Sequence, residues 1–143
     1  MRVGNDNRRV VITGAGPVTP IGIGKEAFWE SLIKGRSAFK RLEFPNRDMS
    51  QYRSQVAAPL EGFDLFQFVD RTKHSRYLGK TSRYAIAATA LALKDAGVEI
   101  ERTLDGEGDR SGQGGQYRLK GVDPFQAGVI LGIGVEAMEL MEH

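Results

Sequence analysis

The chain has 143 residues, the size of one domain, and its 41% hydrophobic and 27% charged residues are the proportions of a globular rather than a disordered protein. The net charge of +2 is small, and it is not clustered as nucleic-acid binding requires. No stretch approaches the ~20 apolar residues that cross a bilayer, and the N-terminus lacks the apolar segment of a signal peptide. Without cysteine, the chain has no disulfide, thiolate metal site or cysteine nucleophile. We therefore expect a cytoplasmic domain that binds neither nucleic acid nor membrane.

The stretch from Arg9 to Gly24 joins a short apolar run to a loop rich in glycine and proline. The run Val10–Ile12 is β-branched and too short for an ordinary helix, so it predicts a buried strand. Gly14 and Gly16 are expected to let the backbone turn sharply after this strand. The two prolines of the loop fix φ and remove donors for ladder hydrogen bonds, which predicts a rigid turn.

A helix is predicted over Lys25–Lys34, because its apolar residues recur at helical spacing and Gly35 stands where helices commonly end. Strand, tight loop and helix together are typical of an α/β domain. The stripe expected to pack into the core consists of Phe28, Trp29, Leu32 and Ile33.

The same loop allows a second interpretation, a dinucleotide site of the short-chain dehydrogenase type. That site needs Thr-Gly, three residues and then Gly-x-Gly, all in one tight turn around a pyrophosphate. Here Thr13-Gly14 is followed by Gly22-Ile23-Gly24 only after seven residues, two of them proline. This spacing disfavours an oxidoreductase.

The middle of the chain is rich in turns, with a short edge strand predicted at Ser54–Ala58 and one or two helical turns at Phe63–Val69. A basic stretch follows at residues 71–76, and such a stretch is most often a solvated face. The clearest helix is predicted over Thr81–Ala96, where six alanines and several aliphatic residues leave almost no polar face. We expect this helix to be buried and to end at Gly97.

The last third begins with a polar, glycine-rich segment, residues 105–121, which predicts a flexible insert. A fully apolar strand is predicted at Ala127–Leu131, and a final helix from Val135 to the end. The Gly-Gln-Gly-Gly of the insert is not a phosphate-binding loop, because no Gly-Lys-Ser/Thr follows it. The Gly-Ile-Gly between the apolar strand and the final helix invites the same comparison, which we also disfavour.

Residues 8–45 closely resemble the N-terminus of the β-ketoacyl-acyl-carrier-protein synthases of the type II elongating kind. Such chains open with R-R-V-V-V-T-G-x-G-x-V-T-P-x-G and continue into a helix that carries Phe-Trp and ends in Gly-Arg-Ser. The resemblance covers most of residues 8–101 and resumes at about 127–141, so that the 105–121 insert has no counterpart. The matching residues are Arg8, Arg9, Thr13, Gly14, Gly16, Val18, Thr19, Pro20, Gly22, Phe28, Trp29, Gly35, Arg36 and Ser37.

The resemblance implies an α/β fold of the thiolase type, in which each of two similar halves places a mostly parallel sheet between helices. This chain would supply a partial thiolase-like fold, the N-terminal portion of one half. The implied partners are acyl carrier protein and either a second copy in a homodimer or the remainder of the synthase. No cofactor and no metal are implied. Isolated, such a piece would expose apolar sheet edges, so we expect it to associate or to be poorly soluble.

The resemblance also assigns roles to individual residues. Lys73 and Arg76 fall on basic positions that help to dock the acidic carrier protein, while Tyr77 stands where the family often has another basic residue. Val135 falls on an aliphatic position at the dimer interface that bounds the acyl pocket. Glu136 and Ala137 replace a common glycine pair, and a carboxylate beside an acyl tunnel would cost several kcal/mol if it were buried unpaired.

The chemistry of the resembling enzymes is not contained in this sequence. Decarboxylative condensation needs a thiolate that holds the acyl chain and donors that stabilise an enolate and an oxyanion. Those enzymes supply a cysteine and two histidines from later parts of a longer chain, whereas here cysteine is absent and the only histidines are His74 and His143. Three interpretations follow: the N-terminal part of a truncated or split synthase, a non-catalytic module that binds carrier protein or synthase, and the disfavoured oxidoreductase.

Overall fold

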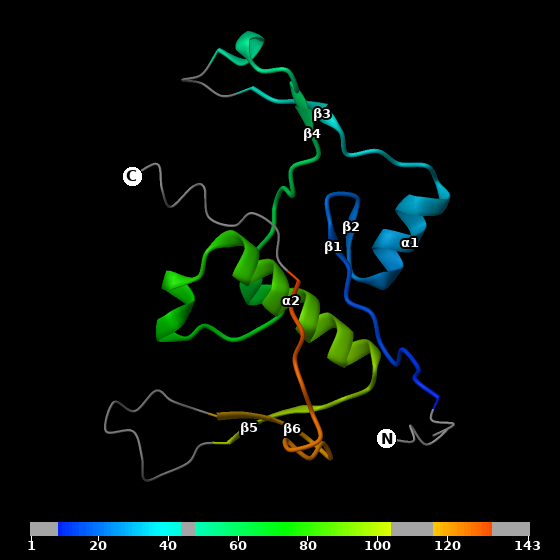
Figure 1. The fold of residues 1–143 in the computed structure, drawn as a ribbon, viewed down its shortest axis with the longest axis vertical. Helices are drawn as coiled ribbons and strands as arrows, with labels where there is room; N and C mark the ends of the chain where they lie inside the picture. The colour runs from blue at the N-terminus through cyan, green and yellow to red at the C-terminus, as the bar shows by residue number, and fades with distance from the viewer. Residues whose placement is uncertain (1–8, 44–47, 104–115, 133–143) are drawn as a thin grey trace, which may run out of the picture.

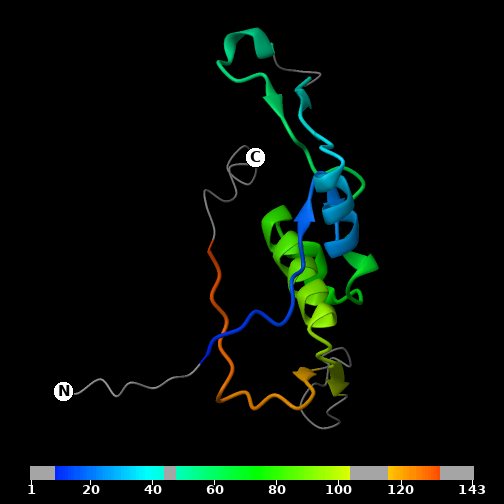
Figure 2. The same ribbon diagram turned by 90° about the vertical axis from the view of Figure 1, so that its right-hand side faces the viewer.

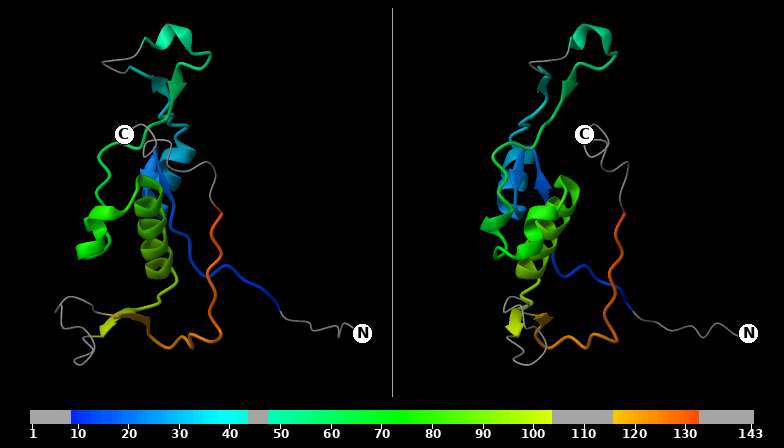
Figure 3. Two further views of the ribbon diagram at one scale, coloured as in Figure 1. Left: turned by 60° about the vertical axis from the view of Figure 1, so that its left-hand side comes forward. Right: turned by 90° about the vertical axis from the view of Figure 1, so that its left-hand side faces the viewer.

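The structure is a computed structural model that describes residues 9–43, 48–103 and 116–132. Helix α2 (Lys80–Asp95) lies at the centre, with helix α1 (Lys25–Ile33) and the hairpin of β1 (Val18–Thr19) and β2 (Gly22–Ile23) beside it (Figure 1). Two further hairpins project to opposite ends of the molecule (Figures 1 and 3). The chain therefore has helices and strands, but its described strands form three separate antiparallel pairs rather than one parallel sheet.

Of the three long helices predicted, the two that fall within the described residues are present, and both end as the sequence predicts. Gly35 and Gly97 follow α1 and α2 with φ angles of 63° and 70°, a conformation that glycine adopts without steric penalty. In α2, Val98 N–H donates to Leu93 O at 2.9 Å and Gly97 N–H to Lys94 O at 3.1 Å. The corresponding pair of bonds closes α1, so each helix terminates in a Schellman motif that satisfies its last carbonyls.

The glycine- and proline-rich loop is the β1–β2 hairpin. Val18 pairs with Ile23 and Thr19 with Gly22, and the Thr19 hydroxyl donates to the Gly22 carbonyl at 2.8 Å. Gly24 N–H then donates to Pro17 O at 2.8 Å, which closes the loop where α1 begins. The predicted turn is present, but the expectation that the loop makes no ladder hydrogen bonds is wrong, because Pro17 and Pro20 lie outside the paired residues.

Gly14 and Gly16 have a different role from the predicted one, since neither has a positive φ. Both lie against α2. A Cβ on Gly16 would overlap the carbonyl oxygen of Ala88 and come within 2.6 Å of the Ala92 nitrogen. A Cβ on Gly14 would overlap the Ala92 carbonyl oxygen. These glycines are needed because the extended segment packs directly on the helix backbone.

The remaining strands are short. Strand β3 (Lys40–Arg41) pairs with β4 (Val56–Ala57), which agrees with the short strand predicted at Ser54–Ala58. Strand β5 (Ile100–Thr103) pairs with β6 (Gln116–Leu119), so the prediction of a loop over residues 105–121 is wrong at its C-terminal end. The 3-10 helices η1 (Met49–Gln51), η2 (Leu65–Gln67) and η3 (Lys73–Tyr77) lie in the turn-rich middle.

The two predicted apolar strands do not form. Residues Val10–Ile12 and Ala127–Leu131 are extended chain without strand pairing, and the exposed fractions of Val10 and Ile130 are 95% and 98%. Both segments run clear of the helices in Figure 2. A strand is stable only when a neighbour satisfies its backbone groups and covers its side chains, and no described segment does so here.

The core is correspondingly small. Leu65 and Ala87 are the buried hydrophobic residues of the described chain. Helix α2 is mostly half-buried rather than buried, and the predicted core stripe of α1 is wrong, because Trp29 and Ile33 are 61% and 64% exposed. No described element covers that side of α1.

Two predictions lie outside the described residues: the final helix with Val135, and most of the glycine-rich insert. Among the residues that the structure does describe, no helix is both long and apolar enough to pass through a membrane.

Candidate functional site

The predicted docking residues lie on one short element, η3. Residue 73 begins this helix and Arg76 follows one turn later, and in a 3-10 helix positions three apart lie above one another. Arg76 is exposed, with its guanidinium carbon 5.7 Å from the centre of the Tyr77 ring. The structure therefore places both predicted positions on one short helix.

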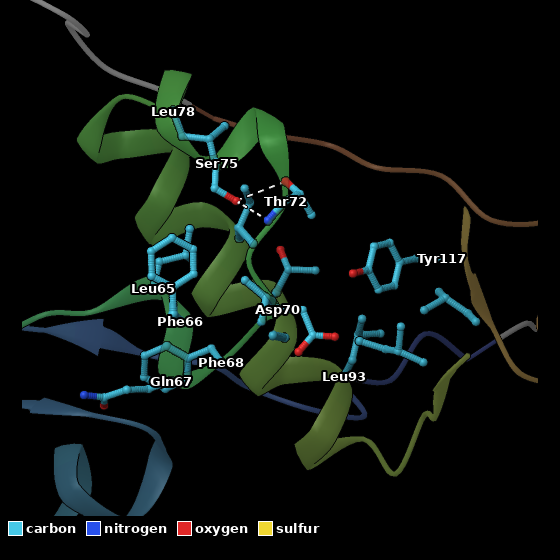
Figure 4. A pocket seen from close by; sticks show the side chains of 16 residues that line it. Leu65, Phe66, Gln67, Phe68, Asp70, Thr72, Ser75, Leu78, Leu93 and Tyr117 are labelled. Carbon is cyan, nitrogen blue, oxygen red and sulfur yellow. Dashed lines mark hydrogen bonds between the residues drawn. The ribbon is translucent and has the colours of Figure 1, made fainter. Parts of the chain in front are cut away.

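The start of η3 is fixed by hydrogen bonds between Thr72 and Ser75, and Figure 4 draws those that the Ser75 hydroxyl makes. Thr72 N–H donates to the Ser75 hydroxyl at 2.9 Å, and Ser75 N–H donates to Thr72 O at 3.1 Å. The two hydroxyls also lie 3.0 Å apart. Ser75 is only 6% exposed, so the turn is held from its inner side while Arg76 faces outward. This arrangement resembles a capping box, which satisfies backbone donors at a helix start.

The end of η3 is held from α2 by Arg83. Its Nε donates to Leu78 O at 3.0 Å and its Nη2 to Ser75 O at 3.4 Å. From Arg71 to Arg83 the sequence has no acidic residue, so this stretch is strongly basic. Its basic residues are Arg71, Lys73, Arg76, Lys80 and Arg83.

An aromatic cluster attaches the segment before η3 to the same helix. The Phe63 ring stacks on Phe68 with centroids 6.0 Å apart and meets Tyr84 of α2 edge to face at 4.9 Å. The Arg71 guanidinium lies 4.3 Å from the centre of the Phe66 ring, a cation–π distance. Residues 63–78 are therefore packed on α2.

A groove of about 730 Å³ lies between this segment, α2 and the β5–β6 hairpin (Figure 4). Most of its lining is apolar, including Leu65, Ile86 and Leu93, and Asp70 and Tyr117 are among its polar residues. The predicted acyl-pocket residue, Val135, lies outside the described residues.

Asp95 joins the other end of α2 to the N-terminal unit. Its carboxylate accepts hydrogen bonds from Ala15 N–H at 3.0 Å and from the Lys25 ammonium at the start of α1. The Lys25 hydrogen bond, followed by that of Ala15, holds the pKa of Asp95 below its ordinary value of 3.8. The same bond raises the pKa of Lys25 above 10.5. One carboxylate thus connects three segments.

This pair predicts how stability depends on pH. The depressed pKa of Asp95 stabilises the folded chain above pH 3.8, and this stabilisation is lost as pH falls through the folded pKa. The raised pKa of Lys25 stabilises it below pH 10.5 and is lost as pH rises further. We expect Asp95→Asn to lower the thermal midpoint between these limits and to flatten the acid side of the profile. Circular dichroism melts at a series of pH values measure both effects.

Glu61→Gln is the matched control, because it breaks an ion pair with Lys40 in which the glutamate side chain is 70% exposed. It should leave the melting profile nearly unchanged, since exposed ion pairs contribute little. Equal profiles for Asp95→Asn and the wild-type chain would contradict the role given to Asp95.

The geometry gives no support to a phosphate or metal site in the described part of the chain. Gly22 belongs to β2, and a Cβ there would overlap the backbone of Ala27 and Phe28 in α1. Gly22, the first glycine of the candidate Gly-x-Gly, is thus closed against protein rather than open to a pyrophosphate. Within the same residues no three His, Asp or Glu side chains gather as a metal would require.

Sequence reasoning found the basic positions but missed Arg83 and the Asp95–Lys25 pair. The sequence holds a partial signal for Arg83. A cation near the N-terminus of a helix is repelled by the helix dipole, so another interaction must compensate for that repulsion. No pattern pointed to Asp95, since its partners lie 80 and 70 residues away in the chain.

Comparisons with known proteins show the family of the chain. The family model "Beta-ketoacyl synthase, N-terminal domain" matches residues 7–141. The match spans nearly the whole chain, and the chain therefore belongs to the β-ketoacyl synthase family.

Individual relatives come from fatty-acid and polyketide synthesis. The chain is 33% identical over 137 residues to a protein named as a polyketide beta-ketoacyl synthase 1 of Streptomyces halstedii. It is 29% identical over 135 residues to 3-oxoacyl-[acyl-carrier-protein] synthase 2 of Vibrio cholerae, and 32% over 123 residues to that of Staphylococcus aureus. These matches cover 96%, 94% and 85% of this chain but only 27%, 27% and 28% of the relatives. The chain corresponds to their N-terminal portion.

Proposed function

We propose that the chain is the N-terminal portion of a 3-oxoacyl-acyl-carrier-protein synthase, which condenses acyl chains with malonyl-carrier protein in fatty-acid or polyketide synthesis. In this proposal the chain forms part of one α/β half of a thiolase-like fold. Its own contribution is to dock the acidic carrier protein on η3. The observation that carries this is the basic turn, held by Ser75 and Arg83 on its inner side and exposing Arg76 on its outer side.

Electrostatics favour an acidic partner at this surface. A cluster of basic side chains attracts an acidic protein during encounter and orients it, with a strength that falls as salt rises. Arg71 and Arg76 are both exposed, and each guanidinium lies within cation–π distance of an aromatic ring, that of Phe66 and of Tyr77 respectively. Such a surface brings the thioester-bearing partner to the synthase and orients it, and it takes no part in bond making.

The chain by itself is proposed to be inactive. Condensation breaks a thioester on the carrier protein and transfers the acyl group to a thiolate, and this sequence contains no cysteine. The nucleophile and the oxyanion donors would have to come from the part of the synthase that this chain does not contain. Acyl-transfer turnover above background by the purified chain would refute this assignment.

The remaining assignments follow from the same family relation. We propose that Val135 bounds the acyl pocket at a dimer interface and that residues 105–121 are an insert specific to this chain. The chain would act in the cytoplasm, with a second copy or the rest of the synthase as its partner. A non-catalytic carrier-binding module is the second candidate, which the same basic turn also favours.

The docking proposal predicts a large effect of charge reversal. Arg76→Glu places a carboxylate against an acidic partner, and we expect it to weaken carrier-protein binding by about tenfold or more at low salt. Fluorescence anisotropy of a labelled acyl carrier protein, titrated with the chain at low and high salt, measures this.

Arg53→Glu is the control, because it makes the same charge change at an exposed residue that does not belong to η3. It should change the affinity much less than Arg76→Glu does. Equal effects of the two variants would indicate general attraction rather than a site. Binding without turnover after the missing synthase part is supplied would favour the non-catalytic module.

A further inference from the structure

Arg83 lies in the first turn of α2, half-buried behind η3. Its guanidinium reaches two carbonyls that the short helix cannot satisfy itself, those of Ser75 and Leu78. The last carbonyls of any helix lack intrahelical donors, and they need side chains or water. Arg83 supplies charged donors to two of them at once.

The position of Arg83 is otherwise unfavourable. The N-terminus of a helix carries partial positive charge, so a cation there is repelled, and the first turn of α2 has no acidic residue to compensate. The two hydrogen bonds that Arg83 donates to η3 compensate for this repulsion. They also tie the orientation of η3 to that of α2.

We propose that Arg83 is a positioning residue that holds η3 on α2 with Arg76 on its exposed side, and thereby sets the affinity for an acidic carrier protein. The inference rests on the docking function proposed above. Arg83 acts through the backbone of η3, because its donors are directed inward at Ser75 and Leu78.

The chemistry of the side chain allows a sharp test. A planar guanidinium can donate to two carbonyls from fixed directions, whereas an ammonium is a single compact point of donation. Arg83→Lys therefore keeps the positive charge but loses the planar group that donates in two fixed directions. Arg83→Gln loses both the charge and that group. If Arg83 positions η3, both variants should bind carrier protein more weakly than wild type, by roughly threefold to tenfold. If it attracts the partner as a charge, Arg83→Lys should bind as wild type does.

Lys94→Gln is the control, since it removes one positive charge from the exposed last turn of the same helix. Binding is measured by anisotropy on the whole chain, together with its synthase partner if it has one. Amide hydrogen exchange is a second measurement, and its rate at η3 would not change if Arg83 acted only through its charge. The Ser75 amide, which donates to Thr72 O, should exchange faster in both Arg83 variants and not in the control.

The outcomes separate the two proposals. Carrier binding that Arg83→Lys leaves unchanged, or Ser75 exchange that neither variant accelerates, overturns the role of Arg83 while the docking function stands. A wild-type chain that does not bind carrier protein, with Arg76→Glu indistinguishable from it, overturns the docking function and this inference together.

Discussion

Replacing Gly16 with alanine is expected to destabilise the chain by about 1–3 kcal/mol or more, the usual cost of forcing atoms into a packed contact. The new methyl would overlap the Ala88 carbonyl oxygen and lie 2.9 Å from the Leu91 Cβ. Because the obstacle is backbone, it cannot rotate aside, and the 9–17 segment would have to separate from α2. A fall in the thermal midpoint, followed by circular dichroism at one protein concentration, measures the effect.

Gly128→Ala is the matched control. Gly128 lies outside every helix and has no positive φ, and a Cβ there would meet nothing within 4 Å. The same methyl addition should therefore change the midpoint little. If both variants melted together, the contact between the glycine segment and α2 would not contribute to stability.

The second large effect concerns association. The extended run near the C-terminal end of the described chain exposes Val129, Ile130 and Leu131 by 85%, 98% and 62%, and Val10 and Ile12 are 95% and 92% exposed. Extended apolar segments with unpaired backbone groups are templates for pairing with other chains. We expect light scattering to give a mass well above the 15.7 kDa of one chain. Ile130→Lys should shift the distribution toward that value.

Thr89→Lys serves as the control for this substitution, since it adds the same charge at an exposed position of α2. It should leave the mass distribution almost unchanged. A compact monomer for the unsubstituted chain at high concentration would contradict the prediction.

The sequence predicts the helices of this chain well because their signals are local. Apolar spacing placed α1 and α2, and Gly35 and Gly97 marked their ends to within one or two residues. The predictions of the two apolar strands are wrong for the opposite reason. Val10–Ile12 has the composition of a buried strand, but a strand depends on neighbours that are remote in sequence, and the described chain provides none.

Gly14 and Gly16 show a second limit of prediction from sequence. Sequence alone assigned Gly14 and Gly16 to a sharp turn, whereas the structure uses them for close packing on α2. Both roles select the residue without a Cβ, so composition cannot separate them. The docking positions came from resemblance to a family, and the charge pattern alone would have been taken for a solvated face. The role of Arg83 in holding η3 becomes apparent only in the structure, which brings the carbonyl groups of Ser75 and Leu78 within hydrogen-bond distance of its guanidinium.

The contact between Gly16 and α2 also has a consequence for genetics. The nearest atom to a side chain at position 16 is a main-chain oxygen, which every amino acid at position 88 would carry. No smaller residue opposite can therefore make room, and a screen for second-site suppressors of Gly16→Ala should not recover changes at residue 88. Compensation would have to come from unrelated stabilising mutations elsewhere.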